Sequence, residues 1–260
     1  MDQVLYELAD GVATITLNKP DVFNSIATEI ADALRAALAR ARTEARAVVV
    51  TGEGRAFCAG ADLKALEAGY QAGTAPELGA LIDTAFNPLL LELAELPMPV
   101  IAAVNGPAAG AGVGLALACD LRIASSNANF TMAFINIGLV PDTGTAWLLP
   151  AIVGYGRAME LSLSGRRVPA DEALAIGLVH RVVEADQLAG EAHAWAAKLA
   201  AGPTYAYART KQLLRRAVET DLVTAVADER DEQDRAGRTA DHLEGVAAFL
   251  AKRPPVYQGQ

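Results

Sequence analysis

The chain has 260 residues, of which 52% are hydrophobic and only 5% aromatic, and it carries a net charge of -9 at pH 7. This composition excludes a disordered or fibrous chain, and a core of Ala, Val, Leu and Ile favours helices packed on a sheet. The negative charge repels polyanions, so we predict no nucleic-acid partner. Lys211, Arg215 and Arg216 lie together on one predicted helix, and we interpret them as a solvated face.

No pattern in the sequence indicates export, membrane insertion or metal binding. Cys58 and Cys119 lie among small apolar residues without the spacing of metal ligands, so we expect buried free thiols. The acidic N-terminus does not resemble a secretory signal. The apolar stretch 100–119 is interrupted by Asn105, Pro107 and four glycines, which argues against a membrane span. We therefore expect a cytoplasmic protein without a metal or redox cofactor.

The first half of the chain alternates strands with helices. Residues 4–9 and 12–18 alternate in polarity around Asp10-Gly11, which predicts a hairpin. Thr28 is placed to cap a helix that runs to about Arg42. The apolar run 47–51 then reads as a buried strand.

The second half is predicted to end in helices. Residues 76–96 have a helical pattern, whereas 100–104 and 121–124 read as buried strands. From Asp142 onward we expect a run of helices, wholly helical over the last 60 or so residues. The chain is thus predicted to divide into an α/β core, 1–200, and a helical region, 201–260, that makes oligomer contacts.

Two glycine-rich segments, 52–63 and 105–114, each follow a predicted buried strand and precede a helix. Small residues there let backbone N–H groups approach a ligand, and two such groups form an oxyanion hole. Tight packing of helix on strand is the alternative for either segment alone. A dinucleotide site is disfavoured because Leu115 occupies the third glycine position of that motif and an acidic residue about 20 positions onward is missing.

Characteristic motifs occur in order over nearly the whole chain: Asn18-Lys-Pro20 with Asn24, Phe57-Cys-Ala-Gly-Ala-Asp62, Asn105-Gly106, Cys119-Asp120 and Phe249-Leu-Ala-Lys-Arg253. Through these motifs the chain resembles the enoyl-CoA hydratase/isomerase (crotonase) family. A second set comprises Phe86-Asn-Pro-Leu89, Phe130-Thr-Met-Ala-Phe134, Gly138-Leu-Val-Pro-Asp142, Trp147-Leu-Leu-Pro150 and the ending Phe249-Leu-Ala-Lys-Arg-Pro-Pro255. This set is similar to the ring-1,2-epoxyphenylacetyl-CoA isomerases of phenylacetate breakdown. The resemblance implies an α/β spiral of repeated β-β-α units with a C-terminal helical trimerisation region, and a homotrimer or hexamer that acts on an acyl-CoA.

The resemblance also implies a layout for the site. The backbone N–H groups of Ala61 and Ala111 are the expected oxyanion donors, and coenzyme A enters only as part of the substrate. Phe249 and Lys252 of a neighbouring subunit are expected to close over its nucleotide. The remaining substrate-binding residues implied by the resemblance are Phe23, Ala59, Gly60, Asp62, Leu63, Gly110, Gly114, Phe134 and Leu139. We expect Asp62 to cap a helix beginning at Leu63, and residues 64–79 to form a mobile wall of the acyl pocket.

The resemblance places the two glutamates of the family's hydratases at Gly114 and Phe134, which cannot transfer protons. Asp142 is the remaining ionisable residue. Its position alone favours a helix N-cap over a catalytic role, whereas the resemblance matches it to the single catalytic aspartate of the isomerases. We therefore predict an acyl-CoA isomerase that moves a double bond or rearranges an epoxide-activated ring. Hydratase and a catalytically silent CoA-binding protein are alternatives. A dehalogenase would need a histidine base, and His180, His193 and His242 all lie late in the chain.

Overall fold

The computed structural model describes residues 2–63, 67, 71, 73 and 76–260. Its main sheet has six strands in the order β1-β2-β3-β4-β6-β9. β1 and β2 are antiparallel, and all other neighbours in this sheet are parallel. The six strands are β1 Val4–Ala9, β2 Val12–Leu17, β3 Ala47–Gly52, β4 Val100–Val104, β6 Leu121–Ser125 and β9 Arg181–Val183.

The hairpin predicted at the N-terminus is confirmed. Asp10 and Gly11 both have positive φ, 52° and 73°, which is the backbone of a two-residue turn matched to the twist of the strands. The next helix, α1 Thr28–Glu44, was predicted two residues too short. The capping role assigned to Thr28 was wrong, because Ala27 is the N-cap and no side chain caps the helix.

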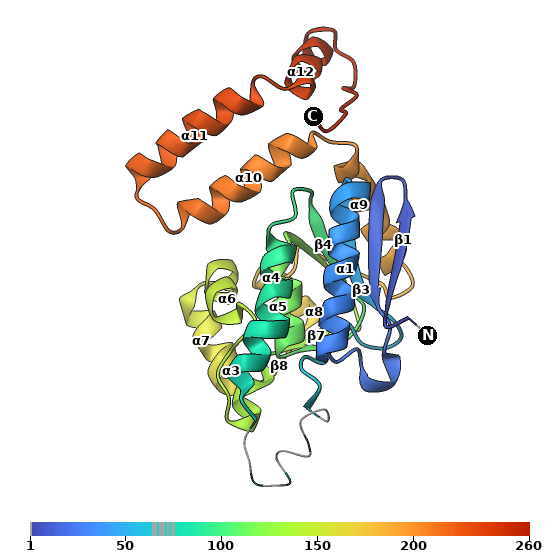
Figure 1. Cartoon of the computed structure of the whole chain (residues 1–260), viewed down its shortest axis with the longest axis vertical. Coiled ribbons are helices and arrows are strands. Elements are labelled where there is room, and N and C mark those ends of the chain that lie inside the picture. Colours follow the sequence, from blue (N-terminus) through green and yellow to red (C-terminus); the bar gives the residue numbers. More distant parts are fainter. Residues whose placement is uncertain (1, 64–66, 68–70, 72, 74–75) are drawn as a thin grey trace.

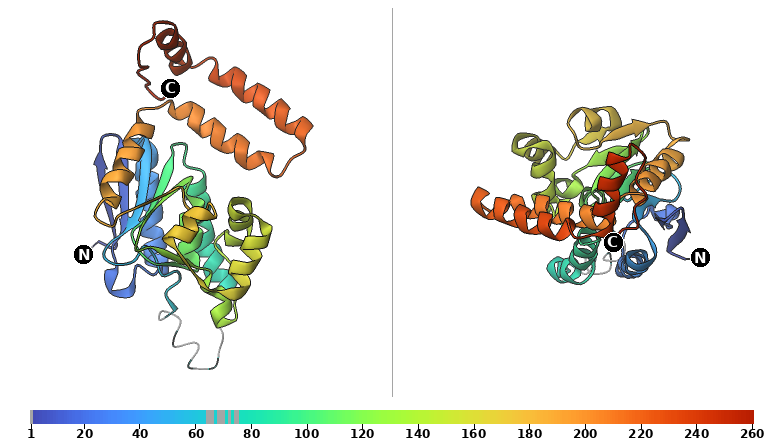
Figure 2. Two further views of the ribbon diagram at one scale, coloured as in Figure 1. Left: turned by 180° about the vertical axis from the view of Figure 1, so that it is seen from behind. Right: turned by 90° about the horizontal axis from the view of Figure 1, so that it is seen from above.

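Helices cover both faces of the main sheet (Figures 1 and 2). Side chains of β3 alternate between two hydrophobic clusters, with Val48 and Val50 in the larger cluster beneath α1 and Val49 in the smaller one beneath α9 Leu188–Ala200. Alternation of side chains across a strand therefore produces the layered core expected for an α/β chain. Within the described residues, no helix is long and apolar enough to cross a membrane.

The middle of the chain builds the remaining part of the body. A helical run of α3 Leu78–Leu81, a π-helical turn Ile82–Phe86 and α4 Asn87–Ala94 confirms the pattern predicted over residues 76–96. A second sheet of three short strands joins β5 Ala108–Ala109, β7 Asn129–Thr131 and β8 Arg167–Pro169. The helices around it are α5 Ala111–Ala118, α6 Thr145–Val153, α7 Tyr155–Ser164 and α8 Ala170–Ala175.

The second half of the chain is not a pure run of helices. β8 and β9, each three residues long, interrupt it, and hydrogen bonds to distant strands hold both of them in place. The last 60 residues contain α10 Thr204–Ala217, α11 Leu222–Ala236 and α12 Ala240–Leu250, but residues 254–260 have no regular secondary structure. Sequence periodicity missed the short strands because three residues are too few to show an alternating pattern.

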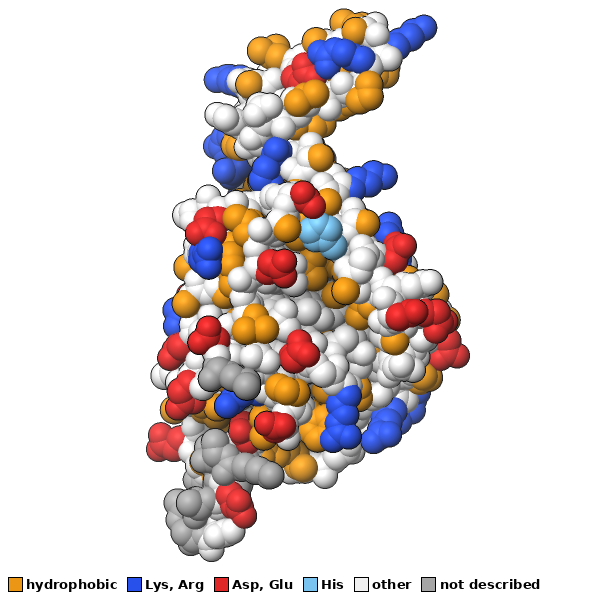
Figure 3. Space-filling model, turned by 90° about the vertical axis from the view of Figure 1, so that its right-hand side faces the viewer, with side chains coloured by type: hydrophobic (Ala, Val, Ile, Leu, Met, Phe, Trp, Pro, Cys, Tyr) orange, Lys and Arg blue, Asp and Glu red, His pale blue; other side chains and the backbone are white. Residues whose placement is uncertain are grey.

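The three C-terminal helices project from the body (Figures 1 and 3). An ion cluster attaches α10 to it. The Lys211 ammonium lies 2.6 Å from the Asp120 carboxylate and donates hydrogen bonds to the carbonyl oxygens of Leu96 and Met98. Arg215 pairs with the other oxygen of Asp120 at 3.2 Å. The prediction of a solvated face was therefore wrong for Lys211, whose side chain is only 13% exposed.

The C-terminal tail ties α12 back to the body. Asp241 is buried, and its carboxylate accepts hydrogen bonds from the backbone N–H groups of Gln258 at 2.6 Å and Gly259 at 2.8 Å. The guanidinium of Arg46, at the start of β3, donates to the carbonyl of Tyr257 at 3.0 Å. The tail is thus a strap between α12 and the main sheet.

Replacing Asp241 with alanine should destabilise the protein, because two backbone N–H groups would lose a charged acceptor. Bonds to charged groups each contribute roughly 1.5–3 kcal/mol, so we expect a loss of about 2–3 kcal/mol in the free energy of unfolding by urea. Asp234→Ala is the matched control, since that carboxylate is 70% exposed and pairs with Arg238 one turn away. Equal stability of the two variants would show that the strap does not hold the tail.

Candidate active site

The two glycine-rich loops leave neighbouring parallel strands, β3 and β4, at the same edge of the sheet. Amide side chains fix the first loop. Asn24 is fully buried and donates to the carbonyls of Glu53 and Ala56, and Asn105 accepts from the Gly52 N–H and donates to the Gly54 carbonyl. These hydrogen bonds hold the loop, which is therefore preorganised.

Glycines let the two loops touch through their backbones. A Cβ at Gly60 would lie 2.7 Å from the carbonyl oxygen of Ala109 and 3.2 Å from the backbone nitrogen of Ala111. Gly60 also has a φ of 90°, which side chains rarely adopt. A Cβ at Gly112 would lie 2.2 Å from the Cys58 carbonyl oxygen. Both approaches are closer than any side chain permits, so these positions require glycine.

The structure brings the two predicted oxyanion donors, Ala61 and Ala111, to this junction. Ala61 follows Gly60 and forms a β-bridge with Ile26. The hydrogen bonds of that bridge are made by the Gly60 carbonyl and the Asp62 N–H, so the Ala61 N–H takes no part in them. Ala111 begins α5, where the first N–H groups have no partner within the helix. Within the described part of the chain, neither N–H group donates a hydrogen bond to protein. Two free donors at one junction are what an oxyanion requires.

Asp142 lies on the loop before α6. Its Oδ1 accepts a hydrogen bond from the Thr143 hydroxyl at 2.8 Å. Burial raises the pKa of the Asp142 carboxyl above its usual range, and the hydrogen bond from Thr143 partly opposes the rise. The alternative role as a helix cap was wrong, because α6 begins at Thr145 with Gly144 as its N-cap and no capping side chain.

The segment that carries Asp142 presses directly on α5. A Cβ at Gly114 would lie 2.5 Å from the carbonyl oxygen of Thr143 and 2.9 Å from its Cβ. Gly114 stands three residues after Ala111, and residues at that spacing share one face of a helix. The loop holding Asp142 therefore lies on the same face as the second oxyanion donor, and no side chain fits at Gly114 between them.

Phe134 and Leu139 give this region an apolar wall. Phe134 is buried, and its ring stands 3.8 Å from the position that a Cβ of Gly110 would occupy. The Leu139 N–H donates to the Phe134 carbonyl at 2.9 Å, which links the two residues through the backbone. An apolar wall beside the second glycine loop is consistent with the desolvation that raises the pKa of Asp142.

Three comparisons with known proteins identify the family. The sequence profile described as enoyl-CoA hydratase/isomerase matches residues 7–260. A 1,2-epoxyphenylacetyl-CoA isomerase of Escherichia coli K12 is 44% identical over 262 residues, covering all of both chains. The chain belongs to the enoyl-CoA hydratase/isomerase family. A probable enoyl-CoA hydratase of Rhodobacter capsulatus is 43% identical over 257 residues, covering 99% of this chain and 98% of that protein.

Solved structures of family members confirm the predicted crotonase fold. An enoyl-CoA hydratase from Polaromonas sp. JS666 matches with a TM-score of 0.92 and 38% identity, covering 98% of this chain and 99% of the other. A putative enoyl-CoA hydratase/isomerase from Mycobacterium abscessus matches with a TM-score of 0.91 and 38% identity, covering 99% and 100%. The names of these relatives divide between hydratase and isomerase.

The remaining CoA-binding positions predicted from the family lie on the rim of the first loop. The Phe23 carbonyl accepts from the Ala59 N–H at 3.0 Å, and the guanidinium of Arg55 lies 4.3 Å from the centre of the Phe23 ring. Phe23 and Leu63 are partly exposed, as a rim requires. The helix that Asp62 was expected to cap, and much of the wall expected over 64–79, lie outside the described residues.

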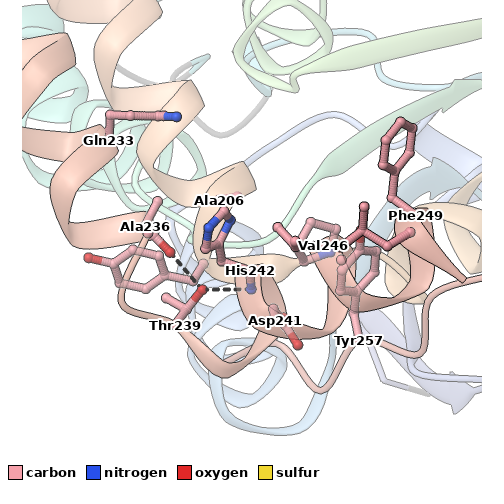
Figure 4. A pocket seen from close by; sticks show the side chains of 14 residues that line it. Ala206, Gln233, Ala236, Thr239, Asp241, His242, Val246, Phe249 and Tyr257 are labelled. Atoms are coloured by element: carbon pink, nitrogen blue, oxygen red, sulfur yellow. Dashed lines mark hydrogen bonds between the residues drawn. The ribbon is translucent and has the colours of Figure 1, made fainter.

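Phe249 lies in α12 and Lys252 just after it, and α12 is at the opposite end of the molecule from α3 (Figure 1). Phe249 is 82% exposed and lies at the edge of a cavity of about 400 Å³ between α10, α11 and α12, past His242 and Val246 (Figure 4). Contact of these two residues with a nucleotide bound to a neighbouring subunit stays a prediction.

The histidine and cysteine side chains considered as alternatives do not serve as acid/base or nucleophile. His180 accepts a hydrogen bond from the Arg122 N–H, His193 pairs with Asp10, and His242 faces the C-terminal cavity. Burial raises the pKa of the thiols of Cys58 and Cys119 to about 12, so neither is a nucleophile at neutral pH. Among the residues described, no three His, Cys, Asp or Glu side chains are grouped to hold a metal ion.

A hydratase-like glutamate at position 114 should fail to create a second acid/base, although the family places one there. Gly114→Glu would force its Cβ against the backbone of Thr143, and overpacking of this kind costs about 1–3 kcal/mol or more. We expect a lower melting temperature and at least a tenfold loss of turnover on any accepted acyl-CoA. Gly190→Ala is the control, because Gly190 is an exposed helical glycine with open space around it. A stable Gly114→Glu variant with gained hydratase activity would refute this account.

Proposed function

We propose that the protein is an acyl-CoA isomerase that shifts a double bond, or rearranges an epoxide-activated ring, next to a CoA thioester. The observation that carries this proposal is the packing of Gly114 against Thr143. It fixes the residue that follows Asp142 against α5, the helix that begins with Ala111, and it leaves no room for a second carboxylate at position 114.

In the proposed reaction, the thioester oxygen accepts hydrogen bonds from the N–H groups of Ala61 and Ala111. Asp142 removes a proton from a carbon near the carbonyl, and the negative charge moves to the thioester oxygen as an enolate. Asp142 then returns the proton to a different carbon, so the double bond moves and the carboxylate is regenerated. One carboxylate suffices because the same proton leaves and returns.

The environment of Asp142 supports this role. A carboxylate with an unperturbed pKa is a weak base at neutral pH, and a raised pKa strengthens it. Burial raises the pKa of Asp142 in the direction that the reaction needs. A half-buried aspartate with a raised pKa also favours an enzyme over a catalytically silent CoA-binding scaffold, for which an exposed capping aspartate would have been enough.

The assembly belongs to the proposal as well. We infer a homotrimer or a dimer of trimers in which Phe249 and Lys252 of a neighbouring subunit cover the nucleotide. The exposure of Phe249, and of Leu250 beside it at 75%, supports this arrangement because both are apolar and uncovered in one chain. A cytoplasmic location and a lack of any cofactor besides the substrate's CoA are parts of the same proposal.

Hydration of an enoyl-CoA is the second candidate, because a relative at 43% identity is named a probable enoyl-CoA hydratase. Adding water needs a group that activates the water and a group that protonates the carbon. The positions of the family's glutamates hold Gly114 and Phe134, so Asp142 would have to perform both steps. The geometry therefore supports isomerisation better.

Asp142→Asn should abolish proton transfer while leaving substrate binding intact. We expect double-bond migration and deuterium exchange on 3-enoyl-CoA, 2-enoyl-CoA and phenylacetate-derived CoA thioesters to fall by about 10²–10⁴-fold. Asp231→Asn, an exposed change on α11, is the control. CoA-ester binding by both proteins without proton transfer by the native enzyme would favour the silent scaffold, and formation of the 3-hydroxyacyl product would favour the hydratase.

The same variant should also change stability in a pH-dependent way. A carboxyl whose pKa is raised on folding destabilises the folded state wherever it is ionised, and this cost disappears as the pH falls below the unfolded pKa. Asp142→Asn should therefore melt at a higher temperature than the native protein at pH 7, and the difference should vanish near pH 3.5. A lower melting temperature at pH 7 would contradict the assigned burial.

A further inference from the structure

The residue that follows Asp142 has an unusual backbone. Among the described residues, five non-glycine residues have positive φ, and Thr143, at 49°, is the only β-branched one. A left-handed conformation is a genuine outlier for a β-branched residue, and it persists only where surrounding structure enforces it. Backbone strain of this kind is common at functional sites.

The surroundings of Thr143 enforce that conformation. Its carbonyl and Cβ are packed against Gly114 of α5, and the residue is 4% exposed. Gly144, which follows at a φ of 69°, is itself packed so closely that a Cβ there would lie 2.6 Å from Leu90. The peptide is thus clamped from two sides, by α5 and by α4.

The clamped backbone turns the Thr143 hydroxyl back onto the side chain of its neighbour. The hydroxyl oxygen lies 2.8 Å from Asp142 Oδ1 and donates a hydrogen bond to it. Within the described part of the chain, Oδ2 accepts no hydrogen bond from protein. The two oxygens of the carboxylate are therefore distinguished, one anchored and one free.

We propose that Thr143 is a positioning residue that anchors Oδ1 of Asp142 and so assigns proton transfer to Oδ2. This inference rests on the proposed function of Asp142 as the acid/base. A single free oxygen visits both carbons without rotation of the carboxylate, and the proton it carries faces the substrate throughout. The contact also stabilises the ionised form of Asp142, which restores the base after each turnover.

The test compares Thr143→Val with Thr143→Ser. Valine keeps the branched shape but loses the hydroxyl, whereas serine keeps the hydroxyl and loses the branch. For isomerisation of 3-enoyl-CoA we expect Thr143→Val to lower kcat by about tenfold or more with KM changed less than about twofold. The acidic limb of its pH profile should move upward by about one pH unit, since the hydrogen bond lowers the pKa of Asp142. Thr143→Ser should stay within about threefold of the native enzyme, with an unmoved pH profile.

A merely structural role would give a different pattern. If valine and serine reduce kcat equally, or if valine leaves both kcat and the pH profile unchanged, the anchoring role is overturned. A melting temperature for each variant separates loss of fold from loss of function. If Asp142→Asn retains full activity, the proposed function fails by itself, whatever Thr143 does.

A measurement that does not depend on turnover tests the anchoring role of Thr143 separately from the proposed isomerase function. In protein labelled with ¹³C at aspartate carboxyl groups, the Asp142 signal is the one missing from Asp142→Asn. Its titration midpoint should rise by about one pH unit in Thr143→Val and stay unchanged in Thr143→Ser. Equal midpoints in the native protein and Thr143→Val would overturn the inference even if the protein isomerises no substrate.

Discussion

The site depends on backbones that approach one another more closely than side chains allow. Gly60 lies against Ala109 and Ala111, Gly112 against Cys58, and Gly114 against Thr143. Any Cβ at these positions would fall within 2.2–2.7 Å of a carbonyl oxygen, so none of them tolerates substitution without movement of the backbone. Through these contacts three segments that are distant in the sequence meet around the first turn of α5. The spacing of these three segments fixes the positions of the backbone N–H donors, which cannot adjust by rotation of a side chain.

Charged contacts, and not close packing of backbones, attach the C-terminal helices to the body. α10 is attached to the body by charges, since Lys211 fills the space between Asp120 and two carbonyl oxygens, and a buried lysine is tolerated only with such partners. Beyond that anchor, α11 leaves large apolar side chains uncovered, among them Leu222 and Val223, each more than 75% exposed. These uncovered apolar side chains support the proposal that other copies of the chain cover them.

The sequence alone predicted those features that depend on local rules. Asp10-Gly11 dictates its own turn, the apolar runs dictate buried strands, and glycine after a strand indicates close approach of backbones. The burial of Lys211 could not be predicted, because its partner Asp120 is distant in the sequence and its two carbonyl acceptors follow from where α10 docks. Thr143 was missed for the same reason. The residues next to Thr143 in the sequence do not indicate that Gly114 packs against it or that its hydroxyl is directed toward Asp142.

The destabilising features at Asp142 and Thr143 are sustained by the same packing. Burial of a carboxylate and a left-handed β-branched residue each destabilise the folded state, and strain of the second kind costs of the order of 1–3 kcal/mol. The packing of Gly114, Gly144 and Leu90 sustains both, because relaxing Thr143 would open contacts on two helices at once. A site without this clamp would be more stable locally, but its carboxylate could rotate and be solvated, and a solvated aspartate is a weaker base. The arrangement therefore lowers local stability but gives the carboxylate one orientation and a raised pKa. A single acid/base residue needs both properties to transfer a proton between two carbons.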